Sequence, residues 1–213
     1  HKRIKEMTLE ENLEVLMKVS DAMAFAHSRH IVNRDLKPEN VMLGGYGETI
    51  VLDWGLALPF GEGKGRLPLA TTAGLGSGTP AYMPPELITG PLNKIGPACD
   101  IYLLGAMLFE VVTGLPPHDF AASQSKSASA GAKMAEIRRV VVDNVIRETE
   151  HSGELIDIAK KAMATKAEDR YPTVVEFQNA IREYQKHAAS RTLVERAKEF
   201  TTVSAPVTTE TKP

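Results

Sequence analysis

The side chains with the clearest capacity for chemistry lie in two short stretches in the first quarter of the chain. Asp35 offers a carboxylate, Lys37 a cation two residues later, and Asn40 an amide five residues later. Asp53 adds a second carboxylate directly after an apolar run. Carboxylate and amide oxygens suit Mg²⁺, which binds oxygen ligands together with substrate phosphates. Phosphoryl transfer needs a proton acceptor for the attacking hydroxyl and positive charge near the phosphate oxygens, so this spacing favours that chemistry.

The elements that must position these side chains are a helix and a hairpin. Apolar residues recur at helical spacing over residues 9–28, and Thr8 and Glu11 match a capping box at the start of this predicted helix. Residues 41–43 and 50–52 are short apolar runs separated by glycines, and they predict the two strands of a small hairpin. The loop with Asp35 therefore joins the helix to the hairpin.

The rest of the chain has a mainly helical pattern. Residues 98–112 are apolar on nearly every side, which is typical of a buried central helix. Further helices are predicted over residues 133–147, 153–165, 173–188 and 191–200. The segments without periodicity are a functional or mobile loop at 58–80, a flexible low-complexity insert at 119–133 and a disordered end at 201–213. The expected fold class is mainly α with a small β-hairpin.

Composition and charge exclude several classes of protein. A chain of 213 residues has room for one domain, or one domain with a tail, at about 100–200 residues per domain. The net charge of −2 gives no electrostatic basis for binding nucleic acid or an anionic membrane. The single cysteine, Cys99, excludes an internal disulfide framework and a cysteine-rich zinc site. No apolar run reaches the roughly 18 residues of a membrane-spanning helix, and the charged opening residues do not resemble a signal peptide.

Five parts of the chain carry further motifs, which are, in chain order, residues 33–40, 53–55, 78–86, 100–105 and Arg170. Together they resemble a known family, the eukaryotic-type (Hanks-type) Ser/Thr protein kinases. Residues 33–40 are similar to its H-R-D-L-K-P-E-N loop, 53–55 stand in place of D-F-G, and 78–86 are similar to G-T-x-x-Y-M-A-P-E. Residues 100–105 are similar to the start of its buried central helix, and Arg170 stands at the arginine that pairs with the P-E glutamate. The resemblance covers roughly residues 8–187. The tryptophan at position 54 is similar to bacterial members of the family.

The resemblance implies a set of catalytic and cofactor-binding residues. Asp35 would orient the substrate hydroxyl and accept its proton, and Lys37 would neutralise charge on the transferring phosphoryl group. Asn40, the third expected catalytic residue, would hold Mg²⁺ together with Asp53. The residues expected to contact the cofactor ATP are Lys37, Glu39, Asn40, Met42 and Asp53, with Met42 under the adenine ring.

The resemblance also implies contacts that shape the site. Thr79 would face the catalytic loop and help form the site for the substrate hydroxyl. Asp100 would bond to the backbone of the catalytic loop, and Glu86 would pair with Arg170.

Regulation is implied by Arg34, which directly precedes the expected proton acceptor. An arginine at this place can pair with a phosphate on the activation loop and order it, so the resemblance implies a switchable enzyme. Thr71 and Thr72 are the best candidates for that phosphate, with Ser77 behind them.

Two substitutions and one absence depart from the family pattern. Asn33 stands where the family has a histidine that packs in an internal apolar column, and Trp54 replaces phenylalanine. The first seven residues leave no room for the Gly-rich loop, strand lysine and helix glutamate that the family uses over ATP. The glycines at 61–65 follow Asp53 and are interpreted as part of the activation loop. The chain also begins at His1 without a methionine, so we expect a fragment that lacks the N-terminal lobe and exposes an apolar patch where that lobe would dock.

The expected organisation is a protein-kinase-like C-terminal lobe (α+β) followed by an extension. The lobe would occupy residues 1–188, with an activation segment at 53–86 and the insert at 119–133. Residues 189–213 would form a charged helix and a disordered tail. The expected location is cytoplasmic, with a parent protein that could be anchored to a membrane through other parts.

Two functions remain open at this point. The first is a Ser/Thr protein kinase that transfers the γ-phosphoryl group of ATP to Ser or Thr of proteins with Mg²⁺. This fragment alone would be inactive, because half an ATP cleft leaves the nucleotide in water. The second is a truncated or pseudokinase-like module that binds partners without catalysis. The presence of Asp35, Lys37, Asn40 and Asp53 favours an active parent, whose partners would be ATP, protein substrates and the missing lobe, and not nucleic acid.

Overall fold

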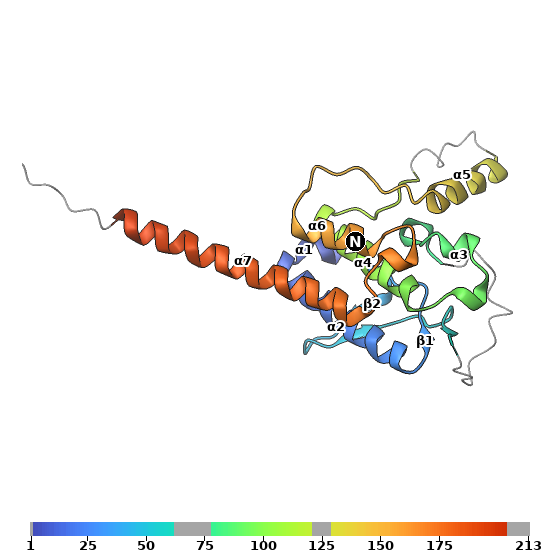
Figure 1. Ribbon diagram of the computed structural model, residues 1–213, viewed down its shortest axis with the longest axis horizontal. Helices are drawn as coiled ribbons and strands as arrows, with labels where there is room; N and C mark the ends of the chain where they lie inside the picture. Colours follow the sequence, from blue (N-terminus) through green and yellow to red (C-terminus); the bar gives the residue numbers. More distant parts are fainter. Residues whose placement is uncertain (1, 62–77, 121–128, 204–213) are drawn as a thin grey trace, which may run out of the picture.

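Helices make up most of the structure, as the computed structural model of residues 2–61, 78–120 and 129–203 shows (Figure 1). The α-helices are α1 (Lys2–Glu6), α2 (Leu9–Ser28), α3 (Glu86–Thr89), α4 (Pro97–Thr113), α5 (Ala130–Val142), α6 (Glu154–Ala162) and α7 (Val174–Val203). Single 3₁₀ turns lie at Pro38–Asn40, Pro80–Tyr82, Leu92–Lys94 and Ala167–Asp169. The predicted mainly α fold is confirmed. Within these ranges, no helix has the length and apolar character needed to cross a membrane.

Helix α4 lies at the centre of the core because its sequence is apolar on nearly every side. All its residues from Cys99 to Glu110 are buried, and it packs against α2, α6 and α7. A β-carbon added to Gly105 would lie 2.5 Å from the β-carbon of Ala162, so this glycine allows α4 and α6 to approach closely. The prediction of a buried central helix is therefore confirmed.

Helix α2 leads into the segment that contains the loop with Asp35 (residues 33–40), and it has the predicted bounds. At its start the Glu11 amide donates to Thr8 Oγ1 (3.2 Å), and the Thr8 amide donates to the Glu11 carboxylate (2.8 Å), which is the predicted capping box. Farther along, Gln178 of α7 donates to the Asp21 carboxylate at 2.7 Å and to the carbonyl of Met17 at 3.2 Å. These contacts hold α2 against α7.

Two small antiparallel sheets lie at the two ends of the loop of residues 33–40. β2 (Val41–Leu43) pairs with β3 (Thr49–Val51), so the predicted hairpin is confirmed with its second strand shifted by one residue. β1 (Ile31–Val32) pairs with β4 (Leu58–Pro59) at the start of the segment predicted as a loop. This second sheet was not predicted, because two-residue strands are too short to show a periodicity.

The C-terminal helices differ in extent from the predicted ones. α5 begins earlier, at the Ser129 cap, and ends before Asn144, whose φ of 50° is left-handed. Part of the insert predicted as flexible is therefore helical, whereas residues 121–128 lie outside the described residues. α7 is one continuous helix because no glycine or proline interrupts its sequence. It projects from the body of the structure (Figure 1). It includes residues 201–203, which were predicted to be disordered, and residues 204–213 lie outside the described part.

Candidate active site

The site is centred on Asp35, in the loop between β1 and the 3₁₀ turn that precedes β2. The side chain of Asp35 is only 10% exposed and accepts four hydrogen bonds. Its Oδ1 accepts from the amide (2.9 Å) and the hydroxyl (2.8 Å) of Thr79, and its Oδ2 accepts from Lys37 Nζ (3.1 Å) and Asn40 Nδ2 (3.3 Å). All four partners are donors, so the carboxylate acts as an oriented acceptor.

Lys37 and Thr79 close this arrangement into a triangle with Asp35. Lys37 Nζ donates to Thr79 Oγ1 at 2.7 Å, while Thr79 donates to Asp35. Thr79 lies 44 residues beyond Asp35 in the sequence, so the contact joins the segment before the 3₁₀ turn Pro80–Tyr82 to the loop that contains Asp35. An acceptor, a cation and a hydroxyl thus lie within hydrogen-bond distance of one another.

Asn40 and Asp53 are neighbours through the backbone of the hairpin. The amide of Leu52 donates to the carbonyl of Asn40 at 2.7 Å, which places Asp53 one residue from that contact. The Nδ2 of Asn40 donates to the Asp35 carbonyl at 2.8 Å, and this leaves its Oδ1 as the group able to act as a ligand. Asp53 is exposed, with a left-handed φ of 54°. One amide oxygen and one exposed carboxylate fit Mg²⁺, which binds few protein oxygens and keeps phosphate and water ligands.

Asn33 links the two carboxylate segments. It is buried, its Oδ1 accepts from the Asp35 amide at 3.0 Å, and its Nδ2 donates to the Asp53 carbonyl at 3.5 Å. Asn33 therefore contributes to the site through hydrogen bonds to the segments of Asp35 and Asp53.

Asp100, at the start of α4, holds the backbone of the loop. Its buried carboxylate accepts from the amides of Asn33 and Arg34, each at 2.9 Å. His27 Nε2 lies 2.8 Å from the same carboxylate. The sequence alone gave His27 no role at the site. Its position in the last turn of a helix that leads directly into the loop was the available signal of a positioning role.

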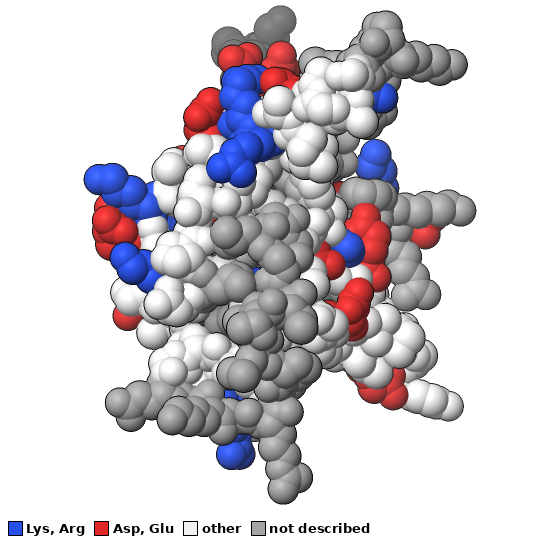
Figure 2. All heavy atoms as spheres, turned by 90° about the vertical axis from the view of Figure 1, so that its right-hand side faces the viewer, with Lys and Arg blue, Asp and Glu red and all other residues white. Residues whose placement is uncertain are grey.

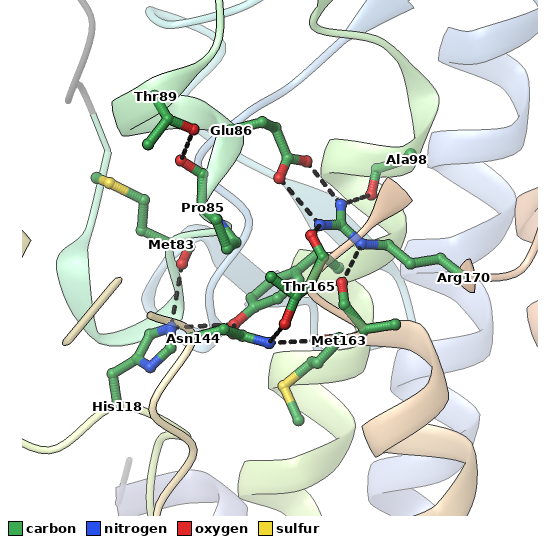
Figure 3. Close-up of polar contacts among 12 residues, drawn as sticks. Met83, Pro85, Glu86, Thr89, Ala98, His118, Asn144, Met163, Thr165 and Arg170 are labelled. Carbon is green, nitrogen blue, oxygen red and sulfur yellow. Dashed lines mark hydrogen bonds and ion pairs between the residues drawn. The ribbon is translucent and has the colours of Figure 1, made fainter. Parts of the chain in front are cut away.

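A second long-range contact joins Glu86 to Arg170 (Figure 3). The two terminal nitrogens of the Arg170 guanidinium, Nη1 and Nη2, donate to Oε1 and Oε2 of Glu86, at 2.6 and 2.9 Å. The arginine side chain is fully buried and also donates to the carbonyls of Ala98, Ala164 and Thr165. This contact fixes α3, which follows Thr79, to the 3₁₀ turn before α7.

Tyr82 anchors the same segment to α4. Its hydroxyl donates to Glu110 Oε2 at 2.5 Å, and both residues are buried. Burial, reinforced by the Glu110 carboxylate, raises the pKa of Tyr82. Burial also raises the pKa of Glu110. Neither residue was predicted from the sequence, because the contact depends on how the segment folds over α4.

Arg34 is buried with an incompletely satisfied guanidinium. Its Nε donates to the Leu56 carbonyl at 2.7 Å, and its backbone has a left-handed φ of 73°. Among the buried side-chain polar atoms of the described residues, Nη2 of Arg34 is the one that makes no hydrogen bond. Burial lowers the pKa of this guanidinium. The candidate phosphate sites Thr71 and Thr72, and Ser77 behind them, lie outside the described residues.

An apolar surface lies beside the hairpin. The exposed fractions are 45% for Met42, 44% for Ile50, 39% for Leu52 and 39% for Trp54. Glu39 is also exposed. These side chains adjoin Asn40 and Asp53 in sequence, so the candidate metal ligands lie next to apolar surface.

The charge distribution is mixed on the face at the right of Figure 1. Figure 2 shows Lys and Arg in small groups, Asp and Glu in others, and uncharged residues between them. The described part of this face therefore has no continuous surface of a single sign.

Known proteins with similar sequences fall into one family. The family description "Protein kinase domain" matches residues 1–185. The chain is 38% identical over 113 residues to the serine/threonine-protein kinase PknD of Protochlamydia amoebophila, covering 47% of this chain and 11% of that protein. It is 30% identical over 171 residues to the serine/threonine-protein kinase PknB of Mycobacterium tuberculosis, covering 80% of this chain and 26% of that protein. It is 29% identical over 205 residues to the serine/threonine-protein kinase PknD of Chlamydia trachomatis, covering 86% of this chain and 21% of that protein. The chain therefore spans at most about a quarter of the length of these curated relatives.

Proposed function

The chain belongs to the protein kinase family, among its bacterial Hanks-type Ser/Thr members, and from this we propose that it carries the catalytic centre of a Ser/Thr protein kinase. The observation that supports the proposal most directly is the triangle of Asp35, Lys37 and Thr79, with Asn40 bonded to the same aspartate. The reaction would transfer the γ-phosphoryl group of ATP to a Ser or Thr hydroxyl of a protein.

The geometry supports a specific role for each of these residues. Bound Mg²⁺–ATP would supply the phosphoryl group and neutralise the charge of its phosphates. Asp35 would accept the proton of the substrate hydroxyl as its oxygen bonds to the γ-phosphorus and ADP leaves. Lys37 would stabilise the charge that develops on the transferring group. Thr79 would hold both side chains in place, and Asn40 and Asp53 would bind the metal.

We propose that residues 1–188 act as the larger, C-terminal lobe of the kinase domain. The exposed side chains of Met42 and Trp54 support this, because an adenine ring and a covering lobe would both remove apolar surface from water. The nucleotide would then lie between two surfaces, where water is excluded and electrostatic stabilisation is strong. Because the reaction consumes ATP, we place it in the cytoplasm.

The assay for this proposal is Mg²⁺-dependent transfer of phosphate from ATP to a generic basic protein by the intact protein that contains these residues. We expect Asp53→Ala to reduce the transfer by about 100-fold or more, because the metal loses its exposed carboxylate ligand. Asp157→Ala, at an exposed position of α6, is the matched control and should retain full activity. Equal activity of the wild type and Asp53→Ala would contradict the proposal, and absence of transfer by both would favour a non-catalytic binding module.

We further propose that a phosphate on Thr71 or Thr72 pairs with Arg34 and orders the activation segment. The buried Nη2 of Arg34, which lacks a hydrogen bond among the described residues, supports this because an unsatisfied buried donor costs about 1–3 kcal/mol. We expect mass spectrometry of the active intact protein to find phosphate at one of these threonines, and alanine at both positions to lower the activity. Active protein without phosphate on the loop would contradict this prediction.

A further inference from the structure

We propose that His118 is a proton-dependent positioning residue. Its imidazolium form ties the backbone carbonyl of Met83, in the activation segment (residues 53–86), to the backbone carbonyl of Val145, beyond α5. Its neutral form releases one of the two. The consequences for activity rest on the proposed function, whereas the protonation and the two contacts do not.

Both ring nitrogens of His118 face acceptors. Nδ1 lies 2.9 Å from the carbonyl oxygen of Val145. Nε2 lies 3.1 Å from the carbonyl oxygen of Met83 (Figure 3). A carbonyl oxygen accepts a proton and cannot donate one. Each of these contacts is therefore a hydrogen bond only when the nitrogen concerned carries a proton.

A third neighbour, Tyr102, does not change this requirement. The tyrosine hydroxyl lies 3.0 Å from His118 Nε2 and 2.5 Å from Asn144 Oδ1. The Nδ2 of Asn144 donates to the carbonyl of Met163 at 2.9 Å and to Thr165 Oγ1 at 3.1 Å, which fixes the orientation of the amide. The tyrosine proton is thus committed to Asn144, and the tyrosine oxygen faces the histidine as another acceptor.

Each neutral tautomer leaves one unfavourable contact. With the proton on Nε2, the lone pair of Nδ1 faces the carbonyl of Val145. With the proton on Nδ1, the lone pair of Nε2 faces both Met83 and Tyr102. Only the doubly protonated ring matches all three contacts, so their geometry fits the charged form.

The surroundings oppose the charge on the ring. His118 is 1% exposed, and burial lowers its pKa although the two carbonyls act in the opposite direction. The charged groups on the adjoining segments are engaged elsewhere. Arg147 pairs with Asp119, and Arg170, whose guanidinium lies over the Tyr102 ring, pairs with Glu86. Burial therefore opposes the charged form that the three contacts fit, so the neutral ring, with one contact open, gains weight as the pH rises.

The position of Met83 links the charge state of His118 to the candidate active site. Met83 lies between Thr79, which bonds to Asp35, and Glu86, which bonds to Arg170. The backbone amide of His118 also donates to the carbonyl of Ala81 at 3.2 Å. His118 thus contacts the activation segment at two points, and its charge state controls how firmly the segment that presents Thr79 is held.

The direct test is a nitrogen-detected NMR titration of the histidine rings in the 213-residue chain between about pH 5 and pH 8. We expect His118 to titrate with a pKa below the usual value of about 6.5. In acid both ring nitrogens should be protonated, and the amide signals next to Met83 and Val145 should shift with the same midpoint. His187, exposed and beside Glu154, is the reference, and His187→Gln should leave these shifts unchanged. A His118 ring that stays neutral throughout, or titrates without moving either amide, would overturn the proposal.

The second test compares the wild type with His118→Gln. Because the folded-state pKa is lowered, protonation favours the unfolded chain, so the wild type should lose more stability than the variant as the pH falls below about 6.5. In the intact protein, the KM for the protein substrate should fall by about twofold or more through the same titration, and only in the wild type. A parallel pH profile of KM for the two proteins would contradict the coupling to the active site. An inactive intact protein would contradict the proposed function and leave the NMR result standing.

Discussion

Asp35→Ala is expected to slow phosphoryl transfer by the intact protein by at least about 100-fold, within the range for loss of a general base. The carboxylate is the only group in the described site that contacts Lys37, Asn40 and Thr79 together. Its removal would take away the proposed proton acceptor and also free the lysine, so both proposed contributions to the transition state would be lost at once. The measurement is kcat with saturating ATP and Mg²⁺.

Two controls separate chemistry from folding in this experiment. Asp157→Ala should keep the wild-type kcat, since that carboxylate lies on the exposed side of α6. Asp35→Ala should still bind nucleotide and Mg²⁺, because Asn40 and Asp53 remain. A variant that retains more than about a tenth of the wild-type kcat would be inconsistent with a general-base role for Asp35.

Arg170→Met is expected to lower the free energy of unfolding by about 3–5 kcal/mol, the usual effect of breaking a buried ion pair from one side. The substitution keeps an unbranched side chain of similar length and removes every donor. Glu86 would lose both of its bonds to the arginine, and the carbonyls of Ala98 and Ala164 would lose theirs. Chemical denaturation of the 213-residue chain measures the difference.

A surface pair on the same chain provides the matched control. Arg139 forms an ion pair with Glu136 on the exposed side of α5, at 2.8 Å. Arg139→Met should leave the denaturation midpoint unchanged, because exposed pairs contribute little. Equal midpoints for wild type and Arg170→Met would show that the buried pair does not support the fold.

The sequence predicted those parts of the fold that depend on local pattern. The capping box at Thr8, the hairpin and the buried helix α4 each have a signature within a few residues, and the structure confirms them. The motif spacing also selected Asp35 and Asp53 as candidate site residues, and the structure places their segments next to each other through Asn33.

The remaining features depend on which distant segments meet. His27, His118 and Glu110 look like ordinary helix or loop residues in the sequence, and each acquires a role only through a partner from another element. The β1–β4 sheet was missed because each strand has two residues. α7 was predicted as two helices, 173–188 and 191–200, because its exposed second half lacks an apolar stripe that would continue the first, although nothing in its sequence ends the helix.

The placement of Asp100 has a consequence for how the protein is made on the ribosome. The amides that it holds lie 66 and 67 residues earlier in the chain, and Arg170 lies 84 residues after Glu86. At about 5–20 residues per second, roughly 3–13 s pass between the synthesis of this loop (residues 33–40) and that of Asp100. The loop is thus translated well before the carboxylate that holds its backbone, and it cannot take up its native hydrogen bonds until Asp100 has been made.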